Sequence, residues 1–282
     1  MRIEPLDASL GATLTDIDLS AMSGEEWSAV ETAFNDHGVL IFPRQHLTDD
    51  EQTSFGLCFG ELEFVRADGN GTVPISNLAP DGGTRSPEDP IVHTLLGNEG
   101  WHTDSSYMPR AAKASMLTAK VVPSGGGQTG WADMRAAYDA LDDTTRDRIA
   151  SLSAHHSLVR SQAKVGFAPQ PGAYGYDVEA PPLRPLVKVH PDTGRRSLFI
   201  GRHAYGIPGL TEAESESLLA ELLDFACQPP RIAEHDWQPG DLVIWDNRCV
   251  LHRARPYDMS EIRVMRHTRV AGEQSEMALN AE

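Results

Sequence analysis

The sequence predicts a mainly β protein with flanking helices, in which many short strands form a jelly-roll-like barrel. Short apolar segments of strand length recur along the chain, and capped helical segments are inserted between them. The chain has 282 residues, of which 40% are hydrophobic, so it can bury a substantial core. No clean linker divides it, and we therefore expect a single domain over residues 1–282.

The first elements that we expect are a helix, a strand and a second helix. Ser23 and Glu26 form a capping box, and apolar residues follow at helical spacing until Gly38 offers a stop. Residues 39–42 are all apolar and precede a proline, which is typical of a buried strand. A second capped helix is expected over residues 48–60.

Two long irregular segments interrupt the regular elements. Residues 64–100 are rich in Gly, Pro, Asp and Asn, with short strand-like pieces only at residues 73–76 and 91–93. Residues 161–185 are broken repeatedly by Pro and Gly. Long segments with so little regular structure are frequently lids or binding loops, so we expect both to be active-site loops.

Turn and cap residues predict the remaining elements. A Pro-Asp-Thr-Gly turn at residues 191–194 indicates a hairpin, and Asp133 and Thr211 are helix N-cap candidates. The tail, residues 272–282, is expected to fray. The expected strands are residues 115–122, 186–190, 197–200, 242–245 and 263–270, and the expected helices are residues 134–141 and 211–227.

The composition restricts partners and location. A formal net charge of −17 would repel nucleic acid and anionic membranes, so we expect neither as a partner. An anionic substrate would then need a local basic pocket. The absence of a membrane-length apolar run or a signal-like N-terminus in the sequence favours the cytoplasm. Cys58, Cys227 and Cys249 are widely spaced and odd in number, so we interpret them as reduced core residues.

The chemistry is expected at residues 101–107, Trp-His-Thr-Asp-Ser-Ser-Tyr, where His102 and Asp104 lie two residues apart. In an extended chain such side chains point the same way and can bind one metal ion. His252, after an apolar strand-like run, is the candidate third ligand. Two His and one carboxylate leave metal positions open, as in non-haem Fe(II) oxygenases. The same ligands are compatible with a hydrolytic zinc site.

Together with residues 10–12, 59–60, 133–138 and 245–248 and with Arg263, the block at residues 102–104 resembles the TauD/TfdA family of Fe(II)- and 2-oxoglutarate-dependent dioxygenases. Within that family the chain is most similar to the aryloxyalkanoate dioxygenases, particularly those acting on chiral phenoxypropionates. The resemblance implies a double-stranded β-helix fold, with Fe(II), 2-oxoglutarate and O₂ as cofactor and cosubstrates.

The resemblance also implies which residues hold the cofactors. His102, Asp104 and His252 match the family's iron ligands, and the choice of iron rests on the resemblance alone. Arg263 matches the 2-oxoglutarate arginine, whose planar guanidinium can donate two hydrogen bonds to one carboxylate. Thr129 matches the family threonine that binds the same carboxylate.

A substrate anion is expected to meet basic residues near the end of the chain. Family members that use taurine or 2,4-dichlorophenoxyacetate have an arginine four residues after the 2-oxoglutarate arginine, and here that position holds His267. If Arg263 points into the barrel, strand alternation places His267 and Arg269 on its face and Arg266 on the other. We expect His267 or Arg269, with a loop residue such as Arg160, to bind the anion. The alternative that Arg269 only meets surface carboxylates stays open.

Two further sets of residues have a structural interpretation. Residues 246–248 are expected to shape the turn before His252, and such residues can orient metal ligands. His93 and His203 are interpreted as hydrogen-bonded structural histidines.

The resemblance implies an enzyme that hydroxylates a small, anionic substrate next to a heteroatom. An aryloxyalkanoate treated in this way would break down to a phenol and an oxo acid. Taurine, alkyl sulfates and natural-product intermediates stay open as substrates of the same family. A cupin-like metal-binding module without turnover is the alternative of another class, and the presence of Arg263 and Thr129 argues against it. We expect a homo-oligomer.

Overall fold

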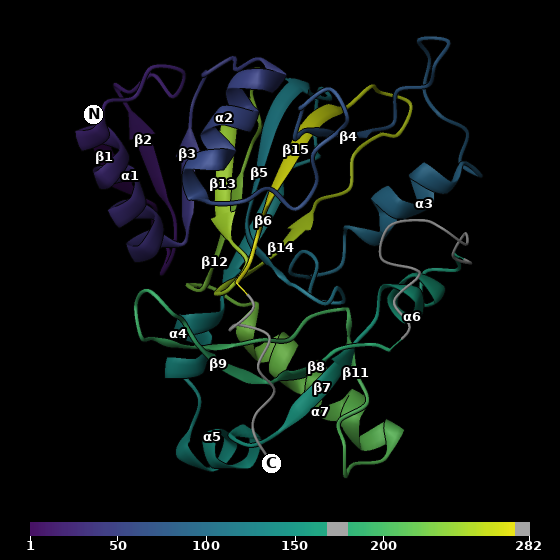
Figure 1. The fold of residues 1–282 in the computed structure, drawn as a ribbon. Helices are drawn as coiled ribbons and strands as arrows, with labels where there is room; N and C mark the ends of the chain where they lie inside the picture. The colour runs from purple at the N-terminus through teal and green to yellow at the C-terminus, as the bar shows by residue number, and fades with distance from the viewer. Residues whose placement is uncertain (168–179, 274–282) are drawn as a thin grey trace.

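The computed structural model describes residues 1–167 and 180–273, and this part of the chain folds around a seven-stranded sheet (Figure 1). The strand order is β1-β2-β3-β13-β5-β15-β4, so strands from the N-terminal and C-terminal parts of the chain alternate in its centre. The strands are β1 (Arg2–Pro5), β2 (Ala12–Thr15), β3 (Val39–Phe42), β4 (Val73–Ser76), β5 (Ala112–Val121), β13 (Leu242–Asp246) and β15 (Val264–Ala271).

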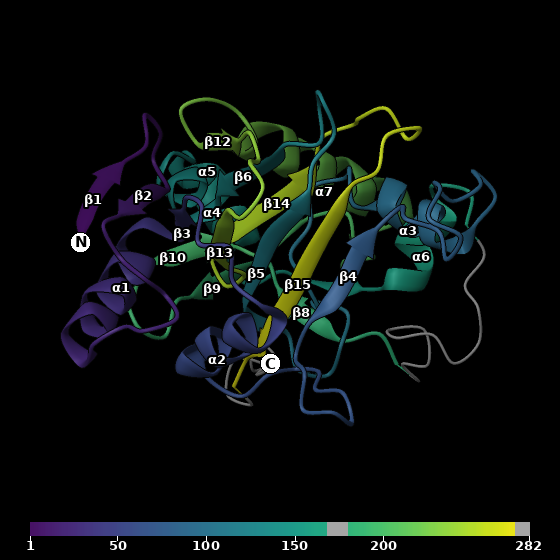
Figure 2. The same cartoon turned by 90° about the horizontal axis from the view of Figure 1, so that it is seen from above.

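A three-stranded sheet packs against the inner face of the large one. It consists of β6 (Thr129–Asp133), β12 (Ile232–His235) and β14 (Val250–Ala254), with β6 in the centre. Figure 2 shows the two sheets as neighbouring layers. Trp131 of β6 and Trp245 of β13 are fully buried between them, with ring centroids 6.0 Å apart. This sandwich of two sheets confirms the predicted mainly β, jelly-roll class.

Two helices cover the outer face of the large sheet. They are α1 (Gly24–His37) and α2 (Asp49–Phe59), and both begin at capping boxes as predicted. Phe34 of α1 and Phe55 and Phe59 of α2 pack in one apolar cluster with side chains of β3, β5 and β13. The centre of the sheet is therefore buried on both faces, which explains the uniformly apolar sequences of β3 and β13.

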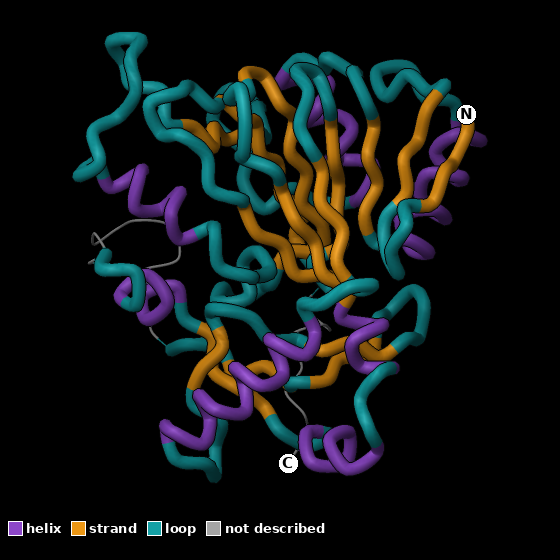
Figure 3. The backbone as a smooth tube through the Cα atoms, turned by 180° about the vertical axis from the view of Figure 1, so that it is seen from behind, coloured by secondary structure: helices purple, strands orange, loops and turns teal. Residues whose placement is uncertain are grey.

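A further group of short helices and strands lies below the sheets (Figure 3). Its apolar core also includes Ala132 of β6 and Leu251 of β14, so it packs against the three-stranded sheet. The helices α4 and α7 begin at the N-caps that the sequence predicted, Asp133 and Thr211, and β9 and β10 form the predicted hairpin. The elements are α4 (Met134–Asp139), α5 (Asp143–Ile149), β7 (Ser153–His156), α6 (Leu158–Ala163), β8 (Leu183–Pro185), β9 (Val187–Val189), β10 (Arg196–Leu198), β11 (Ala204–Tyr205) and α7 (Glu212–Ala226).

The structure corrects the expectation for residues 91–93. They were expected as a strand but lie in helix α3 (Pro90–Gly97). The Asp89 side chain accepts a hydrogen bond from the Ile91 N–H at 2.8 Å, and a proline occupies the first turn. This cap outweighs the strand propensity of a short apolar run.

The two segments expected as active-site loops contain more regular structure than expected. The first, residues 64–100, carries β4 and α3. The second, residues 161–185, contains the end of α6 and the whole of β8, and residues 168–179 lie outside the described residues. Most of the tail, residues 274–282, also lies outside them.

The cysteines differ in their exposure. Cys249 is buried, Cys227 is half-buried and Cys58 is exposed on α2, so the interpretation of Cys58 as a core residue is wrong. Among the residues that the structure places, no helix has both the length and the apolar character needed to cross a membrane.

Candidate active site

Two of the expected metal ligands are joined through their own backbones. His102 follows α3, His252 lies in β14, and the two residues form an isolated antiparallel bridge. The His102 N–H donates to the His252 carbonyl at 2.9 Å, and the His252 N–H donates to the His102 carbonyl at 2.7 Å. Their imidazole rings are neighbours, with centroids 4.1 Å apart and planes tilted by 44°. Two candidate ligands far apart in the sequence are thus held side by side.

Asp104 completes a set of three donors. One donor atom each from His102, Asp104 and His252 lies within 4.8 Å of the other two, and all three side chains line one cavity. The His252 Nε2 lies 3.6 Å from the Asp104 Oδ2. A single ion could therefore contact all three residues with little rearrangement.

The protonation of these side chains suits a divalent metal. The Nδ1 of His102 lies 2.8 Å from the Gly100 carbonyl, which can only accept, so Nδ1 carries the hydrogen and Nε2 is left for a metal. Burial lowers the pKa of His102 and holds that of His252 well below the usual value, so both rings are neutral. Burial acts to raise the pKa of Asp104, but its polar surroundings, formed by His252, His267 and Arg269, outweigh it and hold that pKa well below the usual value. Two neutral imidazoles and a carboxylate fit Fe(II).

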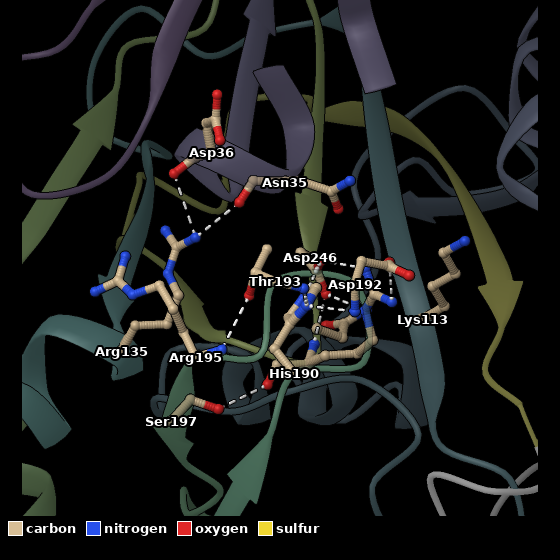
Figure 4. Close-up of polar contacts among 12 residues, drawn as sticks. Asn35, Asp36, Lys113, Arg135, His190, Asp192, Thr193, Arg195, Ser197 and Asp246 are labelled. Carbon is tan, nitrogen blue, oxygen red and sulfur yellow. Dashed lines mark hydrogen bonds and ion pairs between the residues drawn. The ribbon is translucent and has the colours of Figure 1, made fainter. Parts of the chain in front are cut away.

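A second group of potential ligands, His190, Asp246 and Cys249, does not offer a metal site. Figure 4 shows two of them, His190 and Asp246. The Nδ1 of His190 accepts from the backbone N–H groups of Asp192 and Thr193, at 3.3 and 3.2 Å. Its Nε2 donates to the Asp246 Oδ2 at 2.9 Å. The ring therefore has no lone pair left for a metal.

A cavity of about 340 Å³ opens onto the three metal-ligand candidates. It is also lined by four of the five other residues predicted for the site, namely Thr129, Arg263, His267 and Arg269. Side chains from β4, α3 and α6 add apolar and amide groups to its wall. The remaining lining residues are Val73, Ile75, Thr94, Asn98, Tyr107, Leu117, Leu158, Gln162, Arg202, His203, Trp245 and Ala254.

Arg263 is a buried cation without a carboxylate partner in the described part of the chain. The residue is only 5% exposed, its Nη2 donates to the Gly127 carbonyl at 3.1 Å, and its Nε has no hydrogen-bond partner in the described structure. Burial lowers its pKa, because the charged form loses hydration. Such a group fits the carboxylate of a bound molecule.

Thr129 presents a hydroxyl group to the same cavity. The indole Nε1–H of Trp237 donates to the Thr129 Oγ1 at 3.0 Å. Because that oxygen already accepts a hydrogen bond, its own hydrogen is directed to another acceptor. Thr129 and Arg263 are thus two donors in one cavity.

The three residues predicted to bind a substrate anion are in different situations. The His267 ring stacks on Trp245, and its Nε2 lies 3.5 Å from the Asp104 Oδ2. The Arg269 Nε lies 3.6 Å from a carboxylate oxygen of Glu63 inside the protein, so Arg269 does not meet surface carboxylates. Arg160 does not line the cavity.

Arg160 was expected in a loop but lies in helix α6, with its side chain at the surface. Its guanidinium pairs with Glu212, and its Cζ lies 4.7 Å from the centre of the Tyr205 ring. The loop arginine that lines the cavity is Arg202, which donates to the Gly97 and Ser161 carbonyls.

Sequence reasoning gave no site role to three further polar residues of the cavity, Tyr107, Arg202 and His203. The rings of Tyr107 and His203 meet edge to face at 4.9 Å, and the His203 Nδ1 is 2.8 Å from the Ser161 Oγ. Burial raises the pKa of Tyr107 and holds that of His203 well below its usual value. The sequence signal for Tyr107 is its position, three residues after Asp104.

Comparison with known proteins agrees with this geometry. The family model described as "Taurine catabolism dioxygenase TauD, TfdA family" matches residues 2–269. The (S)-phenoxypropionate/alpha-ketoglutarate-dioxygenase of Sphingobium herbicidovorans is 52% identical over 98% of this chain and 97% of its own length. The alpha-ketoglutarate-dependent 2,4-dichlorophenoxyacetate dioxygenase of Cupriavidus pinatubonensis is 40% identical over 93% of this chain and 94% of its own.

A solved structure shares the whole fold. The crystal structure of AAD-2 in complex with Mn(II) and N-oxalylglycine aligns with a TM-score of 0.89 and 38% identity. The alignment covers 100% of this chain and 98% of the other. The family match, the relatives and the shared fold together show that this chain belongs to the TauD, TfdA family of dioxygenases.

Proposed function

We propose that this protein is an Fe(II)- and 2-oxoglutarate-dependent dioxygenase that hydroxylates an aryloxyalkanoate at the carbon next to the ether oxygen. One observation carries the proposal. A single cavity joins a His-Asp-His donor set to Arg263, a buried cation with no carboxylate partner among the residues that the structure describes. A protein that only binds metal has no need of that cation, whereas 2-oxoglutarate brings a carboxylate to it.

The residues divide the work of holding the cofactors. His102, Asp104 and His252 would hold Fe(II) on one face. Arg263 and the Thr129 hydroxyl would hold the distal carboxylate of 2-oxoglutarate. When bound, iron and 2-oxoglutarate supply the oxidation with O₂, in which 2-oxoglutarate becomes succinate and carbon dioxide and one oxygen atom enters a substrate C–H bond.

The cavity suits a molecule with an aromatic ring and an acidic group. Apolar side chains such as Val73, Ile75 and Leu117 share its wall with the basic residues, and its volume of about 340 Å³ is in the range of small-molecule sites, about 300–1,000 Å³. Hydroxylation next to the ether oxygen gives a hemiketal or hemiacetal, which breaks down to a phenol and an oxo acid. Relatives at 52% and 40% identity are named for phenoxypropionate and 2,4-dichlorophenoxyacetate.

For the substrate anion we propose the wall formed by His267 and Arg269. Both residues line the cavity; His267 lies near Asp104, and Arg269 lies near Ser105. Arg269 has the longer side chain and is permanently charged. As the additional basic residue that binds the anion we propose Arg202 and not Arg160, because Arg202 lines the cavity and Arg160 does not.

The proposal extends to the state of the protein in the cell. We propose one domain over residues 1–282, a cytoplasmic location and a homo-oligomeric assembly. Free thiols at Cys58, Cys227 and Cys249 suit a reducing compartment. Cell fractionation and size-exclusion chromatography with light scattering would test the location and the assembly.

The function is tested by anaerobic reconstitution of the purified protein with Fe(II), followed by addition of 2-oxoglutarate. We expect a weak visible charge-transfer band in wild type and a weaker band in Arg263→Ala at equal 2-oxoglutarate. Arg266→Ala is the matched control, because Arg266 pairs with Asp49 outside the cavity and the band should be unchanged. No band in wild type at stoichiometric iron would overturn the dioxygenase assignment.

The substrate class is tested by oxygen-dependent succinate release. We expect at least one enantiomer of 2-phenoxypropionate to increase the release of succinate, and we expect a phenol to form from it. Equal or greater stimulation by taurine or an alkyl sulfate would overturn the aryloxyalkanoate assignment and leave the dioxygenase assignment intact.

A further inference from the structure

We propose that Ser115 and Asn247 position the carboxylate of Asp104 through a relay of hydrogen bonds with one fixed direction. The inference rests on the proposed function, in which Asp104 is an iron ligand. Ser115 lies in β5 and Asn247 directly follows β13, and both side chains are buried. Neither residue lines the cavity, so both act through Asp104.

The direction of the relay follows from the partners of the Asn247 amide. One end of the amide faces the indole Nε1–H of Trp245 at 3.2 Å and the backbone N–H of Asp104 at 3.1 Å. Both of these groups can only donate, so the atom that they face is the oxygen, Oδ1. The other end, Nδ2, must then donate to the Ser115 Oγ, which lies 2.8 Å away.

The hydroxyl group of Ser115 connects the Asn247 amide to the Asp104 carboxylate. Because its oxygen accepts from Asn247, its hydrogen is directed to the Asp104 Oδ2 at 2.7 Å. This carboxylate oxygen is the one that lies nearest to the His252 Nε2, at 3.6 Å. A short hydrogen bond to a carboxylate is strong, so it fixes the rotation of the group toward the metal position.

The backbone around Asn247 is held by a buried ionic network. The Asp246 Oδ1 accepts from the backbone N–H and Nε of Arg248, and its Oδ2 accepts from the Arg248 Nη2 and from His190. The Asn247 N–H donates to the Lys113 carbonyl at 3.0 Å. Figure 4 shows His190 and Asp246 pointing toward each other in this network. The Asn247 amide at the centre of the relay thus belongs to a turn that several buried hydrogen bonds hold in place.

The test removes the hydroxyl that donates to Asp104. Ser115→Ala deletes it with little change of volume, and Ser115→Thr restores it. Thr118→Val is the matched control, because Thr118 is a fully buried residue of the same strand whose hydroxyl has no hydrogen-bond partner in the described structure. The affinity of each protein for Fe(II) is measured anaerobically by competition with a chromogenic chelator, and the melting temperature is measured without metal.

We expect Ser115→Ala to bind Fe(II) about 10–100-fold more weakly, the loss typical of removing a group that orients a metal ligand. Its charge-transfer band with 2-oxoglutarate should shift, Ser115→Thr should recover both properties, and Thr118→Val should match wild type. An affinity within twofold of wild type in Ser115→Ala, or an equal loss in Thr118→Val, would overturn the inference. Failure of the proposed function would appear separately, as wild type that binds Fe(II) but gives no band with 2-oxoglutarate.

Discussion

Arg263 and Arg266 lie three residues apart on opposite faces of the large sheet. Arg263 lines the cavity, whereas the Arg266 Nε lies 3.2 Å from the Asp49 Oδ2 of α2 on the outer face. The pairing of β15 with β5 shifts between Val264 and Met265, and the extra residue, Lys120, belongs to β5. The alternation along β15 therefore continues undisturbed, and His267 and Arg269 share the cavity face with Arg263.

Replacement of Arg263 by Met is expected to stabilise the metal-free protein while preventing 2-oxoglutarate binding. Removal of a buried, uncompensated cation should raise the free energy of unfolding by about 1–3 kcal/mol. Urea denaturation of the metal-free protein measures this change. The KM for 2-oxoglutarate should rise at least about 100-fold, because a charge-assisted pair is lost. A stability equal to or lower than that of wild type would contradict the view that Arg263 is held in place for a ligand.

The opposite result is expected for Arg269, which already has a buried partner. Arg269→Met would leave the Glu63 carboxylate unpaired, and we expect it to lower the free energy of unfolding by about 3–5 kcal/mol. Burial raises the pKa of Glu63, so the carboxylate depends on its neighbours for the charged form. Glu63→Gln in the same protein should recover more than about 1 kcal/mol, because it removes the unpaired charge. Denaturation curves that show strictly additive losses would rule out this coupling.

We expect the KM for the substrate to depend on His267, which lines the cavity, and not on Arg160, which does not. His267→Gln should raise the KM for a phenoxypropionate about tenfold or more and leave the KM for 2-oxoglutarate within about twofold of wild type. Arg160→Ala is the control, and it should change neither value, since Arg160 lies outside the cavity and pairs with Glu212. Because His267 lies near Asp104, Fe(II) affinity must be measured in the same variant. An unchanged KM for the phenoxypropionate would remove His267 from the substrate site.

The sequence was sufficient to find the chain's strongest local patterns. The capping boxes at Ser23, Thr48 and Thr211 give the starts of three helices, because the side chains that form them are neighbours in sequence. The period of two along residues 263–269 places three basic residues on one face, because that geometry depends only on the strand itself.

The remaining site residues depend on contacts that no local pattern carries. The Glu63 partner of Arg269 and the Ser115 partner of Asp104 come from distant strands and loops, and only the tertiary fold brings them together. Arg160 lies in helix α6 and Arg202 in a turn, and no local pattern in the sequence shows which of the two reaches the site. Only the folded chain shows that one is paired on the surface and the other lines the cavity.

His156 of β7 predicts an acid-dependent loss of stability. The residue is 1% exposed, and neither ring nitrogen has a hydrogen-bond partner among the residues in the described ranges. Burial, with the nearby charges of Arg184 and Lys188, lowers its pKa from 6.5 to about 3. Below about pH 6.5 the histidine is therefore protonated in the unfolded chain but still neutral in the folded protein. The contribution of neutral His156 to the free energy of unfolding is complete above that pH and is lost as the pH falls toward 3.

The loss should amount to about 1.4 kcal/mol per pH unit, so between pH 7 and pH 5 wild type should lose about 2 kcal/mol more than His156→Phe. Phenylalanine keeps an aromatic ring against Phe199, whose centroid lies 5.4 Å from that of His156. His155→Phe, at the partly exposed neighbouring position of the same strand, controls for the substitution itself. Urea denaturation at the two pH values measures the difference. If His156→Phe loses as much stability as wild type, the histidine takes up its proton equally in the folded and unfolded chains, and burial does not exclude the charge.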